Sequence, residues 1–266
     1  MLKILICVKQ VPDVDLVKMD PETGNLVRDG VPTMLNPLDS FALSAALSVK
    51  EKYGAEITAI TMGPPMAESV LRECLSFGAD RAVLITGRAF GGADTLSTSY
   101  PIAMAARSLD KFDLIFAGTE SLDGATGQMG AQLAERFDAS QITGCLEIMD
   151  VDEKDRCVTA KRELEHGVMT VRATLPCLIT PEKSGYPTRL PSLKGKLAAR
   201  KAPITVLTEN DIPNLDMELI GVPGSGTVVP KIYPPVLPEP GQMLDMGSDD
   251  ANVTGLIEIL AGKGLV

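Results

Sequence analysis

The alternation of strand-like and helix-like segments in the first half of the chain constrains the fold most strongly. Short apolar runs end at glycine or proline turns and are followed by segments with helical spacing of apolar residues. The expected strands are Leu2–Val8, Ala55–Thr61, Arg81–Thr86 and Leu114–Ala117, and the expected helices cover residues 37–53, 66–77, 95–109 and 126–137. Units of this length predict an α/β fold with a doubly wound, mostly parallel sheet covered on both faces.

The loops that follow the expected strands meet at one edge of this sheet. Ligands of such sheets bind beyond the carboxyl ends of the strands. The loops concerned are residues 7–13, 62–65, 87–95 and 118–127. Asn36 is the expected N-cap of the first helix and Pro37 its first residue, and a long loop can return both to this edge.

The long loop before Asn36 contains a turn signature of its own. Lys18–Asp20 and Asn25–Arg28 flank the sequence Pro21-Glu22-Thr23-Gly24. Proline followed by polar residues and glycine is typical of a tight turn, so a small hairpin is expected here.

The pattern changes after Phe137. Strand-like runs at Gln141–Asp150, Cys157–Glu165 and Val168–Leu175 follow in close succession and predict an antiparallel extension of the sheet. His166 falls in the turn between the last two runs.

Proline becomes frequent toward the C-terminus, before a last helical segment at about residues 250–261. We therefore expect an α/β domain over residues 1–208 and a C-terminal arm over residues 209–266. An arm so rich in proline buries little against itself, so it is either a disordered tail or a segment ordered by a partner. Its apolar residues favour the partner.

Composition excludes several classes of protein. The net charge of −10, the lack of a strongly basic block and the aromatic content of 4% argue against nucleic acid as a partner. No apolar stretch approaches the roughly 18 residues that cross a bilayer, and no secretory signal is visible, so a cytoplasmic protein without membrane insertion is expected. The five cysteines form no Cys-x-x-Cys pair, which indicates reduced core thiols and no metal site.

The stretch Asp113–Phe137 is the best candidate for a phosphate site. It reads as a strand, an acidic glycine-containing loop and a helix that begins at about Thr126. A helix start offers unpaired N–H groups and the positive end of the helix dipole, and Gly124 and Gly127 allow close approach to the main chain. Every doubly wound protein has several such junctions and most bind nothing, so the spacing alone leaves the ligand open.

Catalytic apparatus is missing from the sequence. His166 has no nucleophile or acid fixed beside it by a motif, and no nucleophile elbow, HExxH helix or P-loop is present. No catalytic residue is therefore assigned. A chain that holds a nucleotide without acid–base groups can take its reactivity from a cofactor.

Several motifs together resemble the β subunit of electron transfer flavoprotein, from Met1 to at least Thr180. The matching blocks are Val8–Asp13, Asn36–Asp39, Met62–Pro64, Gly78–Ala82, Asp123–Gly130, Ala160–Glu165 and Leu175–Thr180. The chain departs from the family pattern at His166 and Met169, on an expected surface turn. The resemblance implies a fold of the adenine-nucleotide α-hydrolase-like kind, a heterodimer with an α subunit, and a nucleotide bound by this chain.

Two branches of this family differ in that nucleotide, which is either structural AMP or a second FAD associated with electron bifurcation. The motif Asp-Gly-x-Thr-x-Gln-x-Gly at residues 123–130 and the block Phe90–Thr95 resemble the corresponding sequences of the FAD branch. Ala131 stands where that branch usually has proline. FAD is therefore expected, with AMP in a simple electron carrier as the alternative. A nucleotide-binding sensor or adenylate-hydrolysing enzyme on the same fold is a further alternative.

The resemblance also implies which residues contact the cofactor. The adenosine end would be surrounded by Cys7, Val8, Lys9, Asn36, Pro37, Leu38, Asp39 and Met62. The diphosphate would be held by Gly124, Thr126, Gly127 and Gln128, within a cofactor-binding loop that includes Gly118, Asp123 and Ala125. The isoalloxazine and the docking site of NADH would lie toward Phe90, Gly91, Gly92, Ala93, Asp94 and Thr95.

By the same resemblance, the flavin accepts a hydride from NADH and divides the electrons. One electron passes to ferredoxin, and the other passes through the α-subunit FAD to a flavin dehydrogenase of the acyl-CoA or 2-hydroxy-acid type. The loop at residues 182–193, with Lys183, Tyr186, Pro187 and Arg189, resembles the loop that recognises this dehydrogenase, although an ordinary surface connection explains it nearly as well. The C-terminal arm would wrap the α subunit.

Overall fold

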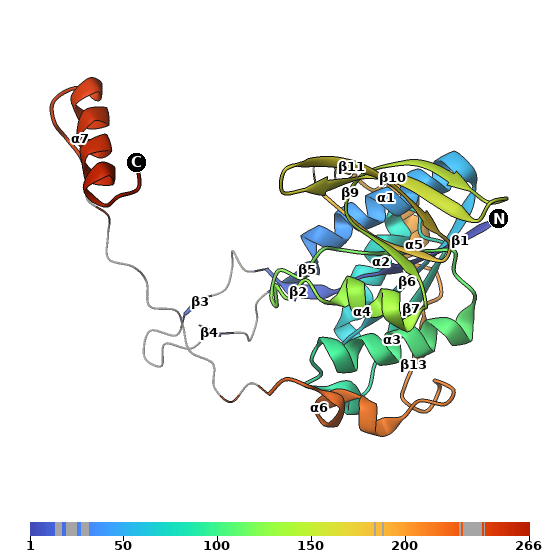
Figure 1. The fold of residues 1–266 in the computed structure, drawn as a ribbon. Helices are drawn as coiled ribbons and strands as arrows, with labels where there is room; N and C mark the ends of the chain where they lie inside the picture. Colours follow the sequence, from blue (N-terminus) through green and yellow to red (C-terminus); the bar gives the residue numbers. More distant parts are fainter. Residues whose placement is uncertain are drawn as a thin grey trace.

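A nine-stranded sheet forms the centre of the molecule. The computed structural model describes residues 1–13, 18–19, 26–27, 32–183, 185–187, 189–228, 230, 241 and 243–266. Within these residues the strand order is β11-β10-β9-β12-β8-β1-β6-β7-β13 (Figure 1). The strands are β1 (Leu2–Cys7), β6 (Ala55–Met62), β7 (Arg81–Ile85), β8 (Leu114–Ala117), β9 (Ser140–Asp152), β10 (Cys157–Leu164), β11 (Gly167–Thr174), β12 (Cys177–Pro181) and β13 (Thr205–Leu207).

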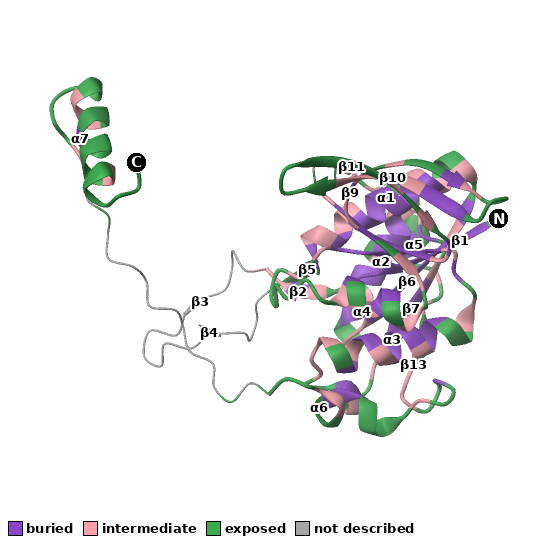
Figure 2. Cartoon of the chain, viewed as in Figure 1, coloured by how far each residue is buried: buried purple, intermediate pink, exposed green. Residues whose placement is uncertain are grey.

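Helices cover both faces of the parallel part of the sheet (Figure 1). The helices are α1 (Pro37–Tyr53), α2 (Glu68–Phe77), α3 (Thr95–Leu109), α4 (Met129–Arg136), α5 (Leu193–Ala199), α6 (Gly221–Gly224) and α7 (Asp249–Gly262). Ile4 and Ile6 of β1 pack into one buried cluster with α1 and α2, whereas Leu5 and Cys7 pack into a second with α3 and α4. Successive strand residues point to opposite faces, so a continuous apolar run buries both. Figure 2 shows this burial along the strands and the inner sides of the helices.

The predicted fold class is therefore confirmed. β1 pairs in parallel with β6 and β8, β6 with β7, and β12 with β8 and β9, while β10 pairs antiparallel with β9 and β11, as the antiparallel extension requires. The sequence analysis did not define β12 and β13, which add parallel strands.

Two helix starts differ from the prediction. The second helix begins as a short 3₁₀ turn, η2 (Pro65–Ala67), and becomes α-helical only at Glu68. The prediction that a helix begins at about Thr126 is wrong, because α4 begins at Met129. Gly127 has a φ of 62°, which an α-helix cannot include, so the helix can begin only after it.

Two pairs of small strands lie around the long loop, and only one of them was expected from the sequence. β2 (Gln10–Pro12) pairs antiparallel with β5 (Thr33–Leu35), and β3 (Lys18–Met19) pairs antiparallel with β4 (Leu26–Val27). The second pair is the expected hairpin, although its turn at residues 21–24 lies outside the described residues.

The chain after β13 returns to the face covered by α3. Ile212 and Ile220 are buried in the cluster around α3, next to the short 3₁₀ helix η4 (Met217–Leu219) and α6. Figure 1 draws α7 apart from the sheet, and Val253 and Ile257 on this helix are 57% and 54% exposed. Residues 231–240 lie outside the described residues, so wrapping of an α subunit by the arm stays a prediction.

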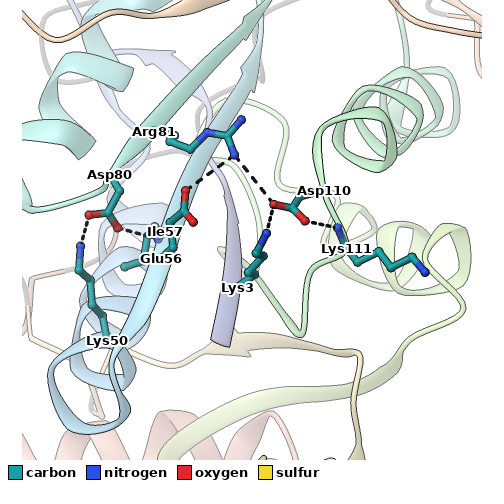
Figure 3. Close-up of polar contacts among 8 residues, drawn as sticks. All are labelled: Lys3, Lys50, Glu56, Ile57, Asp80, Arg81, Asp110 and Lys111. Atoms are coloured by element: carbon teal, nitrogen blue, oxygen red, sulfur yellow. Dashed lines mark hydrogen bonds and ion pairs between the residues drawn. The ribbon is translucent and has the colours of Figure 1, made fainter. Parts of the chain in front are cut away.

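An ion-pair network lies at the amino edge of the sheet (Figure 3). Lys3 pairs with Asp110, which also lies 4.0 Å from Arg81, while Lys50 pairs with Asp80 at 2.5 Å. Asp80 also accepts a hydrogen bond from the N–H of Ile57 at 2.8 Å. These charges tie helix ends and loops to the strands at the edge opposite the strand carboxyl ends, so their role is structural.

A cavity at the carboxyl edge of the sheet

A large cavity lies beyond the carboxyl ends of the parallel strands. Its volume is about 1070 Å³, and it is lined by residues that follow β1, β6, β7 and β8. β1 lies between β6 and β8, so the chain direction across the sheet reverses beside β1. This is a topological switch point, where doubly wound sheets bind ligands.

Most of the site residues predicted from the sequence line this cavity. They are Cys7, Val8, Lys9, Asn36, Asp39, Met62, Phe90, Gly91, Gly92, Ala93, Asp94, Thr95, Gly118, Gly124, Thr126, Gly127 and Gln128. Pro37, Leu38, Asp123 and Ala125 are not among the lining residues, although each is next to one in the chain. Segments as distant as residues 7–9 and 124–128 therefore share one cavity wall.

Asp39 joins the ends of β1 and β8 beneath the cavity. Its Oδ2 accepts the N–H of Lys9 at 2.7 Å, and its Oδ1 accepts the N–H of Gly118 at 3.1 Å. Burial raises the pKa of the Asp39 carboxyl to about 7, and the hydrogen bonds from Lys9, Asn36 and Gly118 lower it in part. The backbone pairing between β1 and β8 ends where the two strands diverge. From there, the Asp39 carboxyl group connects the two strand ends.

Asn36 holds the β8–α4 loop by both ends of its side chain. Its Nδ2 donates to the carbonyl of Glu120 at 2.8 Å, and its Oδ1 accepts the N–H of Leu122 at 3.1 Å. Asn36 is fully buried. The prediction that it caps α1 is right for its position and wrong for its side chain, which makes no capping hydrogen bond.

Asn36→Ala is expected to loosen this loop. The substitution leaves the Glu120 carbonyl and the Leu122 N–H without their partner, at a cost of roughly 1–3 kcal/mol in the free energy of unfolding. Chemical denaturation and protease susceptibility of the loop measure the change. Asn36→Asp is the matched variant. Its side chain keeps an oxygen that accepts the N–H of Leu122, but it places an oxygen instead of an N–H donor against the carbonyl of Glu120. If both variants behave as wild type, the two hydrogen bonds do not hold the loop.

Lys9 and Asp123 form an ion pair at the cavity. Lys9 Nζ lies 2.6 and 2.9 Å from the two carboxylate oxygens of Asp123 and 3.3 Å from Ser121 Oγ. Partial burial raises the pKa of Asp123, but the hydrogen bond and charge of Lys9 outweigh it and hold the pKa below its usual value. The cation that follows β1 is therefore partly neutralised by the loop that follows β8.

The loop before α4 leaves donors for an anion. The N–H groups of Gly124 and Ala125 donate to the Ser121 carbonyl at 3.3 and 2.7 Å. Among the described residues, no acceptor takes the N–H groups of Thr126, Gly127 and Gln128. These donors precede α4, whose dipole favours negative charge at this end.

The starts of α3 and α4 are linked across the cavity. Thr95 Oγ1 donates to Gln128 Oε1 at 2.7 Å and accepts from Gln132 Nε2 at 3.2 Å. Asp94 caps α3, as expected, by accepting the N–H of Ser97 at 3.0 Å. It also accepts the N–H of Thr227 at 2.9 Å, so the returning C-terminal segment supports this wall.

The residues expected to recognise a dehydrogenase lie elsewhere. Tyr186 Oη accepts the N–H of Ile148 at 2.6 Å, and Arg189 donates to Ser48 Oγ at 2.8 Å and pairs with Glu51. Neither residue lines the cavity. Lys183 and Pro187 are exposed.

Residue-level reasoning missed part of the lining. Arg88, Glu120 and Ser121 line the cavity. They lie in the loops 87–95 and 118–127 that the strand-end rule placed at this edge, but they were not singled out as site residues. Thr208 and Thr227 also line it, and no local pattern marks them, because long-range packing brings their segment back.

Among the described residues, neither a cluster of metal ligands nor a reactive thiol is found at this site. The described residues contain no group of three or more potential metal ligands, and all five cysteines are free and buried. Burial, followed by the charge of Asp39, raises the pKa of Cys7, which keeps the thiol protonated. His166 lies in the turn between β10 and β11, as predicted. Within the described residues, no helix has the length and apolar character needed to span a membrane.

A doubly wound sheet with a large cavity at its switch point and free N–H groups before a helix is the arrangement found in nucleotide-binding α/β proteins. Comparison with known proteins gives the family. A model of the electron transfer flavoprotein domain matches residues 23–212. The chain therefore belongs to the electron transfer flavoprotein family.

Relatives agree with this assignment. The chain is 41% identical over 266 residues to the caffeyl-CoA reductase-Etf complex subunit CarD of Acetobacterium woodii, with 100% of both chains covered. It is 40% identical over 244 residues to the electron transfer flavoprotein subunit beta of Clostridium acetobutylicum, with 92% of each chain covered. Over 238 residues it is 40% identical to the protein FixA of Azorhizobium caulinodans, covering 88% of this chain and 85% of FixA. The chain is thus a β-type member of the family.

Proposed function

We propose that this chain is the FAD-binding β subunit of a cytoplasmic, heterodimeric electron transfer flavoprotein. When bound, FAD would accept a hydride from NADH and release single electrons, one to ferredoxin and one through the α-subunit flavin to a partner dehydrogenase of the acyl-CoA or 2-hydroxy-acid type. The similarity to a subunit of a caffeyl-CoA reductase-Etf complex supports a role in such an assembly.

The extent of the cavity carries the choice of FAD over AMP. The cavity runs from Gln128 before α4 to Phe90 after β7, and its volume of about 1070 Å³ is at the upper end of common ligand pockets, roughly 300–1,000 Å³. A mononucleotide at the β8–α4 loop would leave the Phe90 end empty. A dinucleotide extends from the same phosphate site into that end.

The chain's own residues fit such a ligand. The free N–H groups of Thr126, Gly127 and Gln128 would bind the diphosphate, and Lys9 offers the nearby positive charge. Asp39 and Asn36 keep the two sides of the adenosine end at a fixed separation. Phe90 is buried at the other end and supplies an apolar wall for a flavin ring.

The partner contacts are proposals of the same kind. Lys183 and Pro187 are exposed on the loop at residues 182–193 and can meet a dehydrogenase, while Tyr186 and Arg189 fix this loop to the domain. The exposed apolar residues of α7, such as Val253 and Ile257, suit a helix that is covered by an α subunit.

Cofactor stoichiometry tests the proposal. Acid denaturation of the purified heterodimer is expected to release two flavins per dimer and no AMP, measured by absorbance and by chromatography of the supernatant. One flavin with about one AMP would instead identify a simple carrier. Nucleotide hydrolysis by this chain alone would point to an enzyme of another class.

A further inference from the structure

Two of the residues that line the cavity in the described part of the chain are cations, and they differ in their pairing. Lys9 is paired with Asp123. Arg88 lies in the short 3₁₀ helix η3 (Arg88–Phe90) after β7 and is exposed. No carboxylate of the described residues pairs with its guanidinium. A free guanidinium at a ligand cavity is a ready partner for an anion.

Arg88 and the β8–α4 loop follow different strands of the sheet. The strands β8, β1, β6 and β7 are consecutive in the sheet, and neighbouring strands are about 4.8 Å apart, so the ends of β8 and β7 are about 14 Å apart. The free N–H groups at residues 126–128 follow β8, whereas Arg88 follows β7. The proposed FAD already has its diphosphate at residues 126–128 and its ring at Phe90, so we assign the anion at Arg88 to a second ligand.

The position of Arg88 beside Phe90 indicates which ligand carries this second anion. Arg88 is exposed while Phe90, two residues later, is 5% exposed, so η3 turns the aromatic ring inward and leaves the guanidinium at the cavity mouth. The proposed FAD has its diphosphate at residues 126–128 and its ring at Phe90, so a cation two residues from Phe90 lies where the hydride donor must approach the ring. The phosphate-bearing substrate of the proposed reaction is the nicotinamide dinucleotide.

We propose, on the basis of the proposed function, that Arg88 binds the diphosphate of NADH and positions the dinucleotide for hydride transfer. Its planar guanidinium can form two parallel hydrogen bonds to phosphate oxygens. Arg88 contributes to binding and does not take part in the chemistry.

Arg88→Gln in the purified heterodimer tests this role, with binding measured apart from activity. NAD⁺ affinity determined by isothermal titration calorimetry is expected to fall about 10- to 100-fold, and Arg88→Lys to restore part of it. The FAD content is expected to stay at the wild-type value. Arg200→Gln, at an exposed arginine that does not line the cavity, is the matched control and is expected to bind NAD⁺ as wild type does.

A phosphate-free hydride donor separates this role from an effect on the flavin. N-benzyl-1,4-dihydronicotinamide transfers the same hydride to the oxidised flavin and becomes the corresponding pyridinium. We expect Arg88→Gln to slow flavin reduction by subsaturating NADH about 10- to 100-fold and to leave reduction by the benzyl donor unchanged. An equal loss with both donors would mean that Arg88 acts on the flavin, and the inference would be wrong.

The outcomes also separate this inference from the proposed function. Two flavins in the wild-type heterodimer with unchanged NAD⁺ affinity in Arg88→Gln would overturn the role of Arg88 alone. A wild-type heterodimer that contains AMP in place of the second flavin and binds no NAD⁺ would overturn both.

Discussion

Gly118→Ala is expected to remove most of the nucleotide from this chain. Gly118 follows β8 directly and lies against the first turn of α1. A Cβ at this position would lie 2.9 Å from both the backbone N of Asp39 and the carbonyl carbon of Leu38, and would also overlap Asp39 Oδ1. Backbone atoms cannot rotate aside as a flexible side chain can, so α1 and β8 must separate.

This separation would break the hydrogen bonds that shape the adenosine end. Asp39 could no longer bind both Lys9 and Gly118, and the wall between β1 and β8 would open. Overpacking of this kind costs about 1–3 kcal/mol, and the loss of the carboxyl hydrogen bonds adds to it. Flavin and AMP content per purified heterodimer, together with the melting temperature, measure the result.

Gly262→Ala is the matched control. A Cβ on Gly262, in the last turn of α7, meets no atom within 4 Å. This variant is expected to keep wild-type nucleotide content. Full nucleotide content in Gly118→Ala would show that the β1–β8 junction does not shape the binding site.

The layers of this fold could be predicted because they depend on local patterns. Apolar runs such as Leu114–Ala117 are buried in full, and the glycines at 54 and 78 end their helices where the sequence places them. The edge of the sheet that holds the cavity follows from the same alternation. Elements that are determined by residues close together in the sequence were thus predicted well.

The contacts that hold the site together could not be predicted in the same way. Asp39 reaches Lys9 and Gly118 across 30 and 79 residues, and Asp94 reaches Thr227 across 133 residues. Periodicity and turn signals say nothing about such pairs. The sequence analysis accordingly assigned Asn36 as a helix cap, although its amide holds a loop more than 80 residues away.

Asp39→Asn is expected to change how stability depends on pH. Burial raises the pKa of Asp39 from its ordinary value of 3.8 to about 7 in the folded chain. Between about pH 4 and pH 7 the folded chain keeps a proton that the unfolded chain loses. The wild-type free energy of unfolding therefore decreases as the pH rises through this window and levels off above it, by about 4 kcal/mol for this group.

Asparagine removes the titration but keeps the shape of the side chain. Its single oxygen can accept the N–H of Lys9 or that of Gly118 but not both, so the variant loses one hydrogen bond at every pH, at a cost of about 1–3 kcal/mol. The melting temperature of the variant relative to wild type is thus expected to rise by several degrees from pH 5 to pH 8. Circular dichroism of the heterodimer at a series of pH values measures it.

Asp138→Asn provides the comparison, because the Asp138 side chain is 93% exposed and its replacement removes one charge without a buried hydrogen bond. If the Asp39→Asn difference is constant with pH, or falls, the charged carboxylate is the form that the folded chain prefers. The hydrogen bonds from Lys9, Asn36 and Gly118 would then outweigh burial, and Asp39 would bind its neighbours as a permanent anion. A rising difference would instead mean that Asp39, directly beneath the proposed adenosine site, takes up and releases a proton near neutral pH.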